Sequence, residues 1–475
     1  MEVRFQNFRC FKDTGRIPIR PITLLVGENS SGKTSFLAGL NHMFGLLNDE
    51  GIDLNTAPFE MGSMADIVFS KERAKRGRKT FKYESAIDGI SFHWTFVGDL
   101  RDPQINEQEI RFSSKNRSVR VRVLPTKVDI DVHLSREEAK QFKAHGGKFV
   151  QSVNGDGLYR ISTTSLDKGT RATLREWHTN WHTMRSNLLG SGPRVWRICD
   201  DLLEAHTSNR KRGRKIAGRL SQKAQRRSPD FWWENFGLTN YSILNNALRS
   251  INEVRAFAPL REMPRRAYFF GKADLGEKDP YGNLAPARMM ELAKSGYEAH
   301  TILNAIEDFG RASGLFKKLE IDFLTEESNY PFAIKVNAIG GRYSNLPDVG
   351  YGTSQMLPLL VDILGTRASR EFLVQQPEVH LHPRAQAEFA SLMAKLAGRR
   401  RSFVVETHSD YILDRLTFEI KRGFVQPQDI RILFFEKHTD SVKIHPIELN
   451  EFGIPINPPK CYRAFFDAEY EKVWL

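Results

Sequence analysis

The residues with the clearest chemistry form a loop, Gly27 to Thr34, which reads Gly-Glu-Asn-Ser-Ser-Gly-Lys-Thr. An apolar run at 22–26 precedes the loop, and a helical pattern at 35–46 follows it. Glycines let successive backbone N–H groups turn toward one point, and the N-terminus of a helix favours an anion at that point. Lysine then reaches the β- and γ-phosphates of a nucleotide, while the next hydroxyl ligates Mg²⁺. The loop therefore predicts a phosphate-binding site.

By itself this loop predicts a cradle for ATP or GTP together with Mg²⁺, with Thr34 as a ligand of the metal. The family resemblance described below implies that the nucleotide is ATP. The predicted nucleotide-binding residues are Gly27, Asn29, Ser30, Gly32, Lys33, Thr34 and Ser35.

Three later stretches carry polar residues where an apolar strand ends or a helix begins. At 348–355, glycines and Ser354 come before a helical run, an arrangement that is typical of a second anion site but also of ordinary helix initiation. The apolar strand at 372–374 runs into Gln-Gln-Pro-Glu, and the strand at 402–406 runs into Thr-His-Ser. In a parallel sheet these strand ends meet at one edge, so they are candidates for the catalytic groups.

The catalytic candidates at this edge are Glu378, Gln376 and His408. Glu378 is the nearest carboxylate that could polarise water, Gln376 could orient that water, and His408 could bond the γ-phosphate. Gln375 could ligate Mg²⁺ through its amide oxygen. A zinc site made by Glu378, His408 and the histidines at 380 and 382 is the less favoured alternative, because a proline follows directly at 383.

The order of strand and helix patterns predicts an α/β fold in which one nucleotide-binding sheet is split by an insertion. We expect the first part of this head at 1–70 and the second at 250–475. Alternating strands predict a β-rich, antiparallel insertion at 71–135, and the residues at 136–249 read as basic and helical.

Composition restricts the class of protein and its partners. The formal net charge is +13, and the run from Asn209 to Arg227 holds nine Lys/Arg and no acid, so it is either a solvated loop or a nucleic-acid contact. Three scattered cysteines do not form a disulfide framework. Since no apolar run reaches membrane-spanning length, we expect a cytoplasmic protein without a membrane partner.

Four ordered motifs, GENSSGKTS, DVGYGTSQMLPLL, FLVQQPEVHLHPRAQ and FVVETHSDYIL, resemble those of the ABC-type ATPases of the SMC, RecF and OLD (overcoming lysogenisation defect) group. They are most similar to a bacterial AAA-family subset that reads PEVHLHP and ETHSDYIL. The resemblance covers roughly residues 1–70 and 250–470. It implies the fold of a P-loop ABC-type ATPase head.

The resemblance also implies roles for individual residues. It assigns the Walker A motif to Gly27, Gly32, Lys33, Thr34 and Ser35, and the ABC signature to Gly350, Gly352, Ser354 and Gln355. His408 stands for the switch histidine. In that family two heads enclose two ATP molecules, so a homodimer or higher homo-oligomer is implied, with Ser354 acting in trans. The Q-loop has no clear counterpart, and Asp66 is only a candidate for it.

The chain departs from the family where Walker B should end in two acids, since Gln375 and Gln376 stand there. A neutral amide supplies no negative charge and cannot act as a general base near neutral pH. We therefore expect an ATPase that hydrolyses slowly and works as a switch. The alternative is that ATP binding itself is the signal.

OLD nucleases append a Toprim domain after the ATPase, whereas only 67 residues (475 − 408) follow His408. The resemblance therefore implies an ATPase sensor or scaffold that controls a separate nuclease or toxin in anti-phage defence, as in Septu, PARIS and retron-type systems. A RecF-like repair ATPase that binds DNA through the basic run is the first alternative. An ATP-bound structural or inhibitory protein without turnover is the second.

Overall fold

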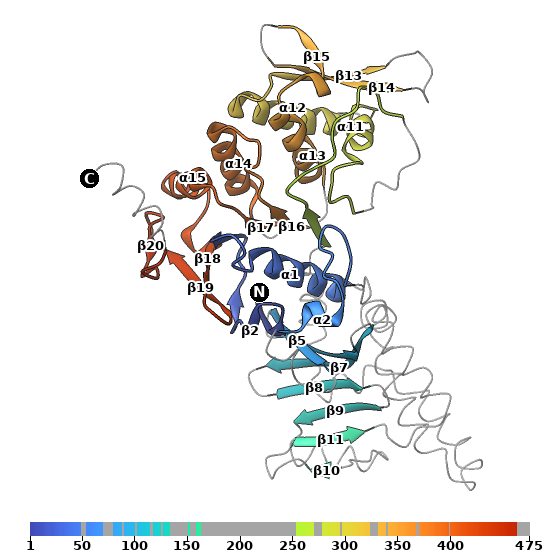
Figure 1. Ribbon diagram of the computed structural model, residues 1–475, viewed down its shortest axis with the longest axis vertical. Helices are drawn as coiled ribbons and strands as arrows, with labels where there is room; N and C mark the ends of the chain where they lie inside the picture. Colours follow the sequence, from blue (N-terminus) through green and yellow to red (C-terminus); the bar gives the residue numbers. More distant parts are fainter. Residues whose placement is uncertain are drawn as a thin grey trace, which may run out of the picture. The chain divides into compact units, whose positions relative to one another are not determined.

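The computed structural model describes residues 1–48, 54–69, 79–87, 90–99, 102–114, 117–124, 127–133, 151–152, 158–162, 253–269, 278–294, 297–323, 331–338, 341–366, 370–398 and 400–462 (Figure 1). The chain divides into two compact units. Unit 1 comprises Met1–Arg16, Gly45–Asp53 and Gly62–Ile251, and unit 2 comprises Ile17–Phe44, Leu54–Met61 and Asn252–Leu475. Each unit is thus assembled from segments that are far apart in the sequence.

Unit 1 is built on an antiparallel sheet with the strand order β10-β11-β9-β8-β7-β6-β5-β1-β2. The strands are β1 (Glu2–Phe8), β2 (Phe11–Asp13), β5 (Lys79–Ile87), β6 (Ile90–Asp99), β7 (Asp102–Ser114), β8 (Arg117–Leu124), β9 (Lys127–His133), β10 (Gln151–Ser152) and β11 (Leu158–Ser162). From β5 to β9, consecutive strands are sheet neighbours, as the alternating pattern at 71–135 predicted.

Aromatic side chains on one face of β1, β5 and β6 make the core of unit 1. Phe81 and Phe96 stack with ring centroids 4.4 Å apart, and Tyr83 meets the edge of Phe5 at 5.0 Å. All four side chains are fully buried. Because side chains alternate across a strand, the residues between them face the other way and can be polar.

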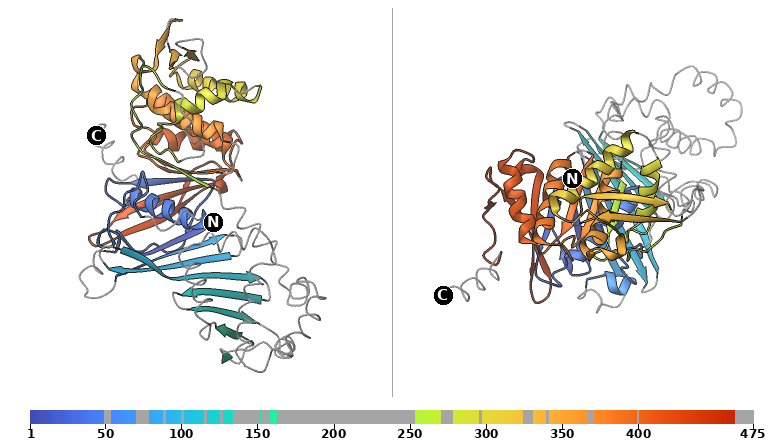
Figure 2. Two further views of the ribbon diagram at one scale, coloured as in Figure 1. Left: turned by 90° about the vertical axis from the view of Figure 1, so that its right-hand side faces the viewer. Right: turned by 90° about the horizontal axis from the view of Figure 1, so that it is seen from above.

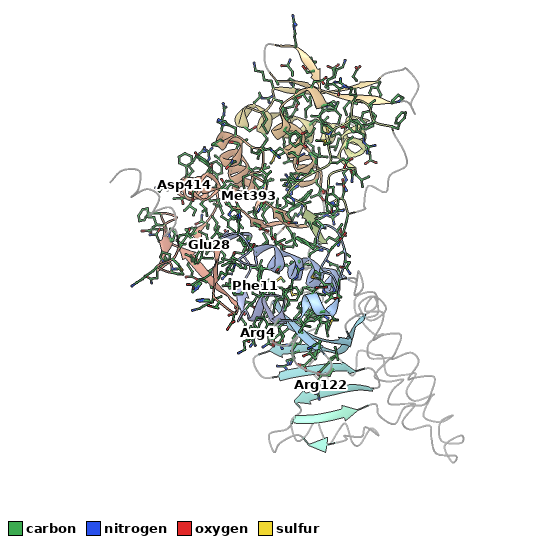
Figure 3. All side chains as sticks on the ribbon, viewed as in Figure 1. Arg4, Phe11, Glu28, Arg122, Met393 and Asp414 are labelled. Atoms are coloured by element: carbon green, nitrogen blue, oxygen red, sulfur yellow. The ribbon has the colours of Figure 1, made fainter. Side chains whose placement is uncertain are left out.

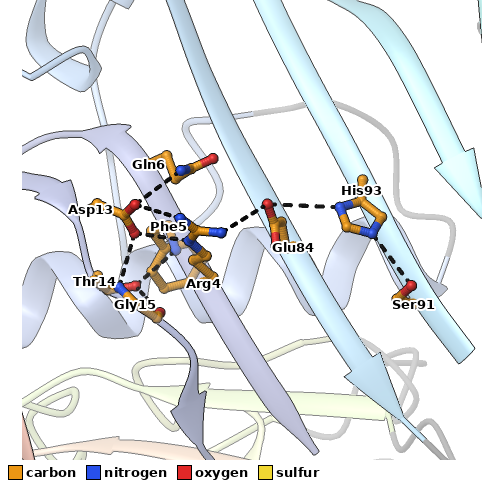
Figure 4. A network of polar contacts seen from close by, with 9 residues as sticks. All are labelled: Arg4, Phe5, Gln6, Asp13, Thr14, Gly15, Glu84, Ser91 and His93. Carbon is orange, nitrogen blue, oxygen red and sulfur yellow. Dashed lines mark hydrogen bonds and ion pairs between the residues drawn. The ribbon is translucent and has the colours of Figure 1, made fainter. Parts of the chain in front are cut away.

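On that polar side, unit 1 carries a closed network of charged groups (Figure 4). The Arg4 guanidinium donates to both carboxylate oxygens of Asp13, at 2.9 and 2.6 Å. The Gly15 N–H and the Gln6 amide add two further hydrogen bonds to the same carboxylate. The hydrogen bonds from Arg4 are the largest cause that lowers the pKa of Asp13 to about 2. Every oxygen of Asp13 is therefore used within unit 1.

The helical expectation for 136–249 is wrong for residues 151–152 and 158–162, where β10 and β11 pair in antiparallel register and β11 pairs with β9. Tyr159, Arg160, Ile161 and Ser162 alternate between apolar and polar with a period of two, which suits a strand that extends an existing sheet. The basic run at 209–227 and the spaced tryptophans lie outside the described residues.

Unit 2 contains a mainly parallel sheet with the order β12-β16-β17-β4-β18-β19-β20. The parallel strands are β12 (Glu253–Phe257), β16 (Arg370–Gln375), β17 (Arg401–Glu406), β4 (Ile22–Gly27) and β18 (Ile430–Lys437). The antiparallel edge is β19 (Val442–Leu449) and β20 (Pro455–Ile456), and the short β3 (Ile17–Pro18) precedes β4. The strand before the phosphate loop thus pairs with strands about 400 residues downstream, which confirms the predicted split sheet.

Helices cover both faces of this sheet (Figures 1 and 2). One face carries α1 (Lys33–Asn48), whose Phe36 ring meets Phe435 of β18 edge-on at 5.6 Å. The other face carries α11 (Ala285–Lys294), α12 (Tyr297–Ser313), α13 (Tyr351–Gly365), α14 (Pro383–Leu396) and α15 (Asp410–Lys421). Alternate strand residues such as Leu24, Val374 and Val405 join the same buried cluster as Met393 of α14, which is labelled in Figure 3.

The remaining elements are small. β13 (Lys318–Phe323), β14 (Phe332–Asn337) and β15 (Tyr343–Asn345) form a small antiparallel sheet in unit 2, and η1 (Leu346–Asp348) and η2 (Pro427–Asp429) are single turns. In unit 1, α2 (Met64–Ile67) is one turn, and the Asp66 carboxylate accepts the N–H and hydroxyl of Ser63 and so caps its own helix. Within the described ranges, no helix is both long and apolar enough to cross a membrane.

Candidate nucleotide site

The phosphate loop joins β4 to α1 through a backbone that requires glycine. Gly27 has a φ of +140° and Gly32 a φ of +91°, both in the region that glycine favours. A Cβ on Gly27 would lie 2.6 Å from the carbonyl oxygen of Phe435 on β18. Ser30 also has a positive φ, +60°, and the buried hydroxyl of Ser31 has no hydrogen-bond partner. The loop is therefore held tightly against the end of the sheet.

Lys33 lies at the first position of α1 and is buried beneath the loop, with 3% of the residue exposed. Its ammonium donates to the carbonyl oxygens of Gly27 at 2.9 Å and Glu28 at 2.7 Å. Burial lowers the pKa of Lys33, and the nearby carboxylates of Glu406 and Glu378 oppose that shift. Lysine can donate three hydrogen bonds, so one remains for a ligand.

The Thr34 hydroxyl faces the end of β17. Its Oγ1 lies 3.0 Å from Oε1 and 2.9 Å from Oε2 of Glu406, the last residue of that strand. Glu406 is buried, with 4% of the residue exposed, and burial raises its pKa while the Thr34 bond and Lys33 oppose the change. The hydroxyl that the sequence assigns to Mg²⁺ is thus paired with a carboxylate that the sequence analysis had not assigned any role.

Glu378 lies in the turn after β16 and contacts the residues that follow β17. The Thr407 hydroxyl donates to its Oε2 at 3.0 Å, and the His408 N–H donates to its Oε1 at 2.7 Å. Burial is the largest cause that raises the pKa of Glu378, and these hydrogen bonds lower it in part. A carboxylate with a raised pKa, next to an open edge of the sheet, is suited to accept a proton from water.

The two glutamines occupy different positions at the end of β16. Gln375 is the last residue of the strand, is buried, and is the register partner of Glu406 on β17. Gln376 has a φ of +39°, is half-buried, and donates its backbone N–H to the Glu406 carbonyl at 2.8 Å. The chain therefore turns sharply at Gln376, and this turn brings Glu378 back toward β17.

The histidines at 380, 382 and 408 make different contacts. His408 is largely exposed, and partial desolvation of its ring together with the Lys33 cation lowers its pKa. His380 packs its ring against Tyr351 at 4.8 Å, and Nδ1 of His382 accepts the Arg384 N–H at the start of α14. No group of three or more His, Cys, Asp and Glu side chains within the described residues is arranged to hold a metal ion. The zinc alternative therefore has no geometry to support it in that part of the chain.

The glycine-rich segment before α13 differs from the sequence expectation in its helix start. The helix begins at Tyr351, after the N-cap Gly350, so Ser354 lies inside the first turns and not ahead of them. Ser354 is 4% exposed, and its hydroxyl donates to the Tyr351 carbonyl at 2.8 Å. This hydrogen bond is common, because a serine hydroxyl inside a helix readily donates to a backbone carbonyl three or four residues earlier. The exposed residues of the segment 348–355 are Asp348, Gly350 and Tyr351.

Arg261 lies after β12 and is buried, with 4% of the residue exposed. Its guanidinium nitrogens have no hydrogen-bond partner, and burial lowers its pKa to about 10 while the Glu378 carboxylate opposes that shift. The Arg261 backbone is fixed by Gln355 of α13, whose Oε1 accepts the Arg261 N–H at 2.8 Å and whose amide donates to the Arg261 carbonyl at 3.2 Å. Gln355 thus serves to hold a buried cation behind the catalytic edge.

The site fits Mg²⁺ and a nucleoside triphosphate. The loop offers backbone N–H groups and the Lys33 ammonium to phosphates, and the Thr34 hydroxyl, the Glu406 carboxylate and the Gln375 amide form a set of oxygen donors of the kind that Mg²⁺ takes. Sequence reasoning missed Glu406 and Arg261. One signal was available for Glu406, because it ends a predicted strand just as Gln375 does. Arg261 sits in APLREMPRR, where nothing in the letters marks it as buried.

Two protein-family models match parts of the chain. One, described as an "AAA ATPase domain", matches residues 1–117 and includes the phosphate loop. The other, described as "AAA domain, putative AbiEii toxin, Type IV TA system", matches residues 220–414 and includes β16, β17 and His408. The two matches lie on either side of residues 118–219, and both are to models of AAA-type ATPase domains.

The chain is also similar to solved SMC heads. One is an SmcHead bound to the C-winged helix domain of ScpA, with 12% identity and a TM-score of 0.38, covering 94% of this chain and 98% of that chain. A second is an Smc head domain with an extended coiled coil bound to the C-terminal domain of ScpA from Pyrococcus furiosus, with 12% identity and a TM-score of 0.36, covering 99% of this chain and 98% of that chain. A third is an SMC head domain from Thermotoga maritima, with 11% identity and a TM-score of 0.34, covering 94% of this chain and 98% of that chain. No curated protein matches the chain. Because these TM-scores are low, the fold is assigned from the strand order of the parallel sheet in unit 2.

Proposed function

We propose that this protein is an ABC-type ATPase that binds ATP with Mg²⁺ and hydrolyses it slowly. One observation carries the proposal. A phosphate-loop lysine, a hydroxyl and two carboxylates, Lys33, Thr34, Glu406 and Glu378, gather at the carboxyl edge of one parallel sheet. The AAA ATPase matches on both parts of the split sheet support it.

In the proposed reaction, Lys33 and the N–H groups of the loop bind the phosphates, and Mg²⁺ neutralises part of their charge. Glu378, which the backbone turn at Gln376 brings toward β17, accepts a proton from the attacking water. His408, which follows the Thr407 contact, lies beside Glu378 and is suited to bond the γ-phosphate. The hydrolysis is slow because the acid that usually ends Walker B is absent, so fewer charges act on the transition state.

The ATPase proposal is tested by phosphate release from the parent protein and from Lys33→Ala, both with saturating Mg²⁺. Loss of a charge-assisted phosphate contact costs about 1.5–3 kcal/mol, so we expect ATP binding to weaken by about tenfold to a hundredfold and hydrolysis to fall to background. If the parent is no faster than Lys33→Ala but binds ATP, the second alternative applies, an ATP-bound structural or inhibitory protein.

We further propose that two copies enclose the nucleotide, with the start of α13 of one copy facing the phosphate loop of the other. The exposed Gly350 and Tyr351 form a helix N-terminus with open N–H groups, which suits a γ-phosphate. Ser354 takes part only if its hydroxyl leaves the Tyr351 carbonyl. Light scattering with and without ATP checks whether the monomer converts to a dimer.

As the finer function, we propose that ATP-driven closure makes the protein a sensor or scaffold for a separate nuclease or toxin in anti-phage defence. The family description that names a toxin of a type IV toxin–antitoxin system is consistent with such a setting. Co-purification with the product of the neighbouring gene tests the idea. A neighbour that neither binds this protein nor changes its activity when ATP is added would remove it.

The alternative is a RecF-like ATPase that binds DNA directly. It is favoured by the nine basic residues without an acid between Asn209 and Arg227. Neutralising the run should abolish duplex binding, and the affinity of the parent should fall steeply with salt because each phosphate contact releases counterions. No duplex binding at low salt would exclude this alternative.

A further inference from the structure

The negative charge at this site is found on a different strand from the one where the motif predicts it. The resemblance expects an acid at the end of β16, but Gln375 stands there. In the parallel register of β16 and β17, Gln375 is directly opposite Glu406. Both are the last residues of their strands, so both lie at the same edge of the sheet. A carboxylate is therefore present at the expected level, one strand away.

Sheet order brings this carboxylate closer to the phosphate loop. β17 lies between β16 and β4 and pairs with β4, so the end of β17 is the immediate neighbour of the loop that follows β4. The Thr34 hydroxyl, next to the phosphate-binding lysine, contacts both carboxylate oxygens of Glu406 at 3.0 and 2.9 Å. The exposed side of the pair is Thr34, because Glu406 is buried.

The other nearby carboxylate is already engaged. The two oxygens of Glu378 accept hydrogen bonds from Thr407 and from the His408 backbone, and neither is placed against Thr34. Gln375 can supply an oxygen but no charge. Mg²⁺ is bound in such sites through one or two carboxylates together with substrate phosphates. Glu406 is the carboxylate that meets both conditions, since it can supply a negative charge, unlike Gln375, and it touches the predicted hydroxyl ligand.

We propose that Glu406 supplies the carboxylate that holds the Mg²⁺ of the nucleotide, directly or through a bound water, in place of the acid that is missing at Gln375. The inference rests on the proposed ATP site and makes it more specific. It also explains how a chain with two glutamines at the end of Walker B retains a charged metal site. In this arrangement Glu378 is not a ligand of the metal, and its oxygens, which accept hydrogen bonds from Thr407 and the His408 backbone, keep lone pairs that can act on water.

The test measures the affinity for a fluorescent ATP analogue with saturating Mg²⁺ and with EDTA, in the parent and in Glu406→Gln. We expect the Mg²⁺-dependent gain in affinity to fall by at least about tenfold in the variant, because metal sites lose about 10–100-fold in affinity when a supporting group is removed. Affinity in EDTA should stay unchanged. Glutamine is nearly isosteric and its oxygen can still accept the Thr34 hydroxyl, so the fold should be kept, which the thermal unfolding midpoint verifies.

Two further variants make the test specific. Glu378→Gln removes a carboxylate of the same edge and should keep the full Mg²⁺-dependent gain. Gln375→Asp in the Glu406→Gln background moves the charge back to β16 and should restore at least part of the gain. Electron paramagnetic resonance of bound Mn²⁺, read in the presence of a non-hydrolysable ATP analogue, gives the metal affinity without reference to turnover.

The outcomes separate this inference from the proposed function. If the parent binds no nucleotide, the ATPase proposal and the inference both fail. If the parent binds with an Mg²⁺-dependent gain that Glu406→Gln retains in full, the ATPase proposal stands, and Glu406 is only a structural partner of Thr34.

Discussion

Two sets of charged groups, one on the sheet of unit 1 and one at the end of the parallel sheet of unit 2, differ in how fully their hydrogen-bonding groups are paired. In unit 1, Arg4 and Asp13 satisfy each other on a partly exposed surface, and the Gly15 N–H completes the carboxylate (Figure 4). In unit 2, buried charged groups at the end of the parallel sheet keep unused bonding capacity. Among the described residues, Arg261 has no hydrogen-bond partner for its guanidinium, and the Lys33 ammonium donates only to the backbone carbonyl oxygens of Gly27 and Glu28.

This difference indicates where function lies. A network that is closed on itself stabilises the fold locally, whereas buried charges without full partners cost folding free energy and are kept where a ligand completes them. We therefore expect substitutions in unit 1 to change stability slightly and leave ATP chemistry intact. Substitutions at the edge of the unit 2 sheet should do the reverse.

The largest effect is expected from Glu378→Gln, which removes the proposed general base but keeps the shape of the side chain. Hydrolysis should fall by about 10²–10⁴-fold, the contribution of a positioned base, while ATP affinity stays near that of the parent. Single-turnover phosphate release and equilibrium binding separate the two quantities. Parent-like turnover in this variant would show that Glu378 does not activate the water.

The pH profile of the parent gives a second view of the same residue. Because burial raises the pKa of Glu378, its ionised form is lost at a higher pH than for an ordinary glutamate. As pH falls, kcat should therefore decline at a pH above the usual carboxylate range, and this acid limb should disappear in Glu378→Gln. Rates should be compared at constant ionic strength and saturating Mg²⁺.

A smaller effect is expected from Gly350→Glu at the N-cap of α13. A Cβ at this position meets no atom within 4 Å, so the monomer can accept the side chain. The new carboxylate would oppose the phosphates of a partner copy, and a like-charge contact costs several kcal/mol, so ATP-dependent dimers and turnover should drop by at least about tenfold. Gly350→Ala is the matched control, and ATP binding by the monomer should be unchanged in both. ATP-dependent dimers that persist in Gly350→Glu would argue against the proposed arrangement.

Arg261→Met tests the buried cation behind Glu378. A buried guanidinium without hydrogen bonds is costly to desolvate, so replacing it with an apolar side chain of similar volume should leave the free energy of unfolding equal or raise it. Turnover should nevertheless change with pH, because the Arg261 cation lowers the pKa of Glu378 and its loss moves the acid limb of kcat to higher pH. The exposed Arg265 in the same segment provides a control, and Arg265→Met should leave the profile unmoved. A lower unfolding midpoint with an unshifted profile would make Arg261 purely structural.

The smallest effect is expected from Asp13→Asn in unit 1. The pair with Arg4 is partly exposed, with 38% of the Asp13 side chain accessible, and such pairs contribute about 0.2–1 kcal/mol. The pKa of Asp13 is lowered to about 2, so this contribution is present above the unfolded-state value and is lost as pH falls toward 2. Urea denaturation of parent and variant should differ at pH 7 and converge near pH 2. A changed ATPase rate would contradict the expectation that this network in unit 1 does not affect ATP hydrolysis.

The sequence predicted much of unit 2, because its signals are local. Apolar runs at 22–26 and 430–435, the glycines of the phosphate loop and the polar ends of two strands are each readable within about ten residues. Helix starts were predicted less well. The helix α13 begins at Tyr351, whereas Ser354 was expected to precede it, since glycine-rich turns and first helical turns look alike in sequence. The strands at 151–162 were missed because short strands at a sheet edge carry a weak pattern.

The sequence by itself determined that a phosphate loop, a base candidate and a parallel sheet are present, since glycine geometry, residue chemistry and hydrophobic period are properties of short segments. Only the tertiary structure decided which acid faces Thr34. The two residues are 372 positions apart, and their contact exists because β17, not β16, is the neighbour of β4. Strand order in a sheet is set by packing across the whole domain, so no local pattern around Glu406 could reveal its partner.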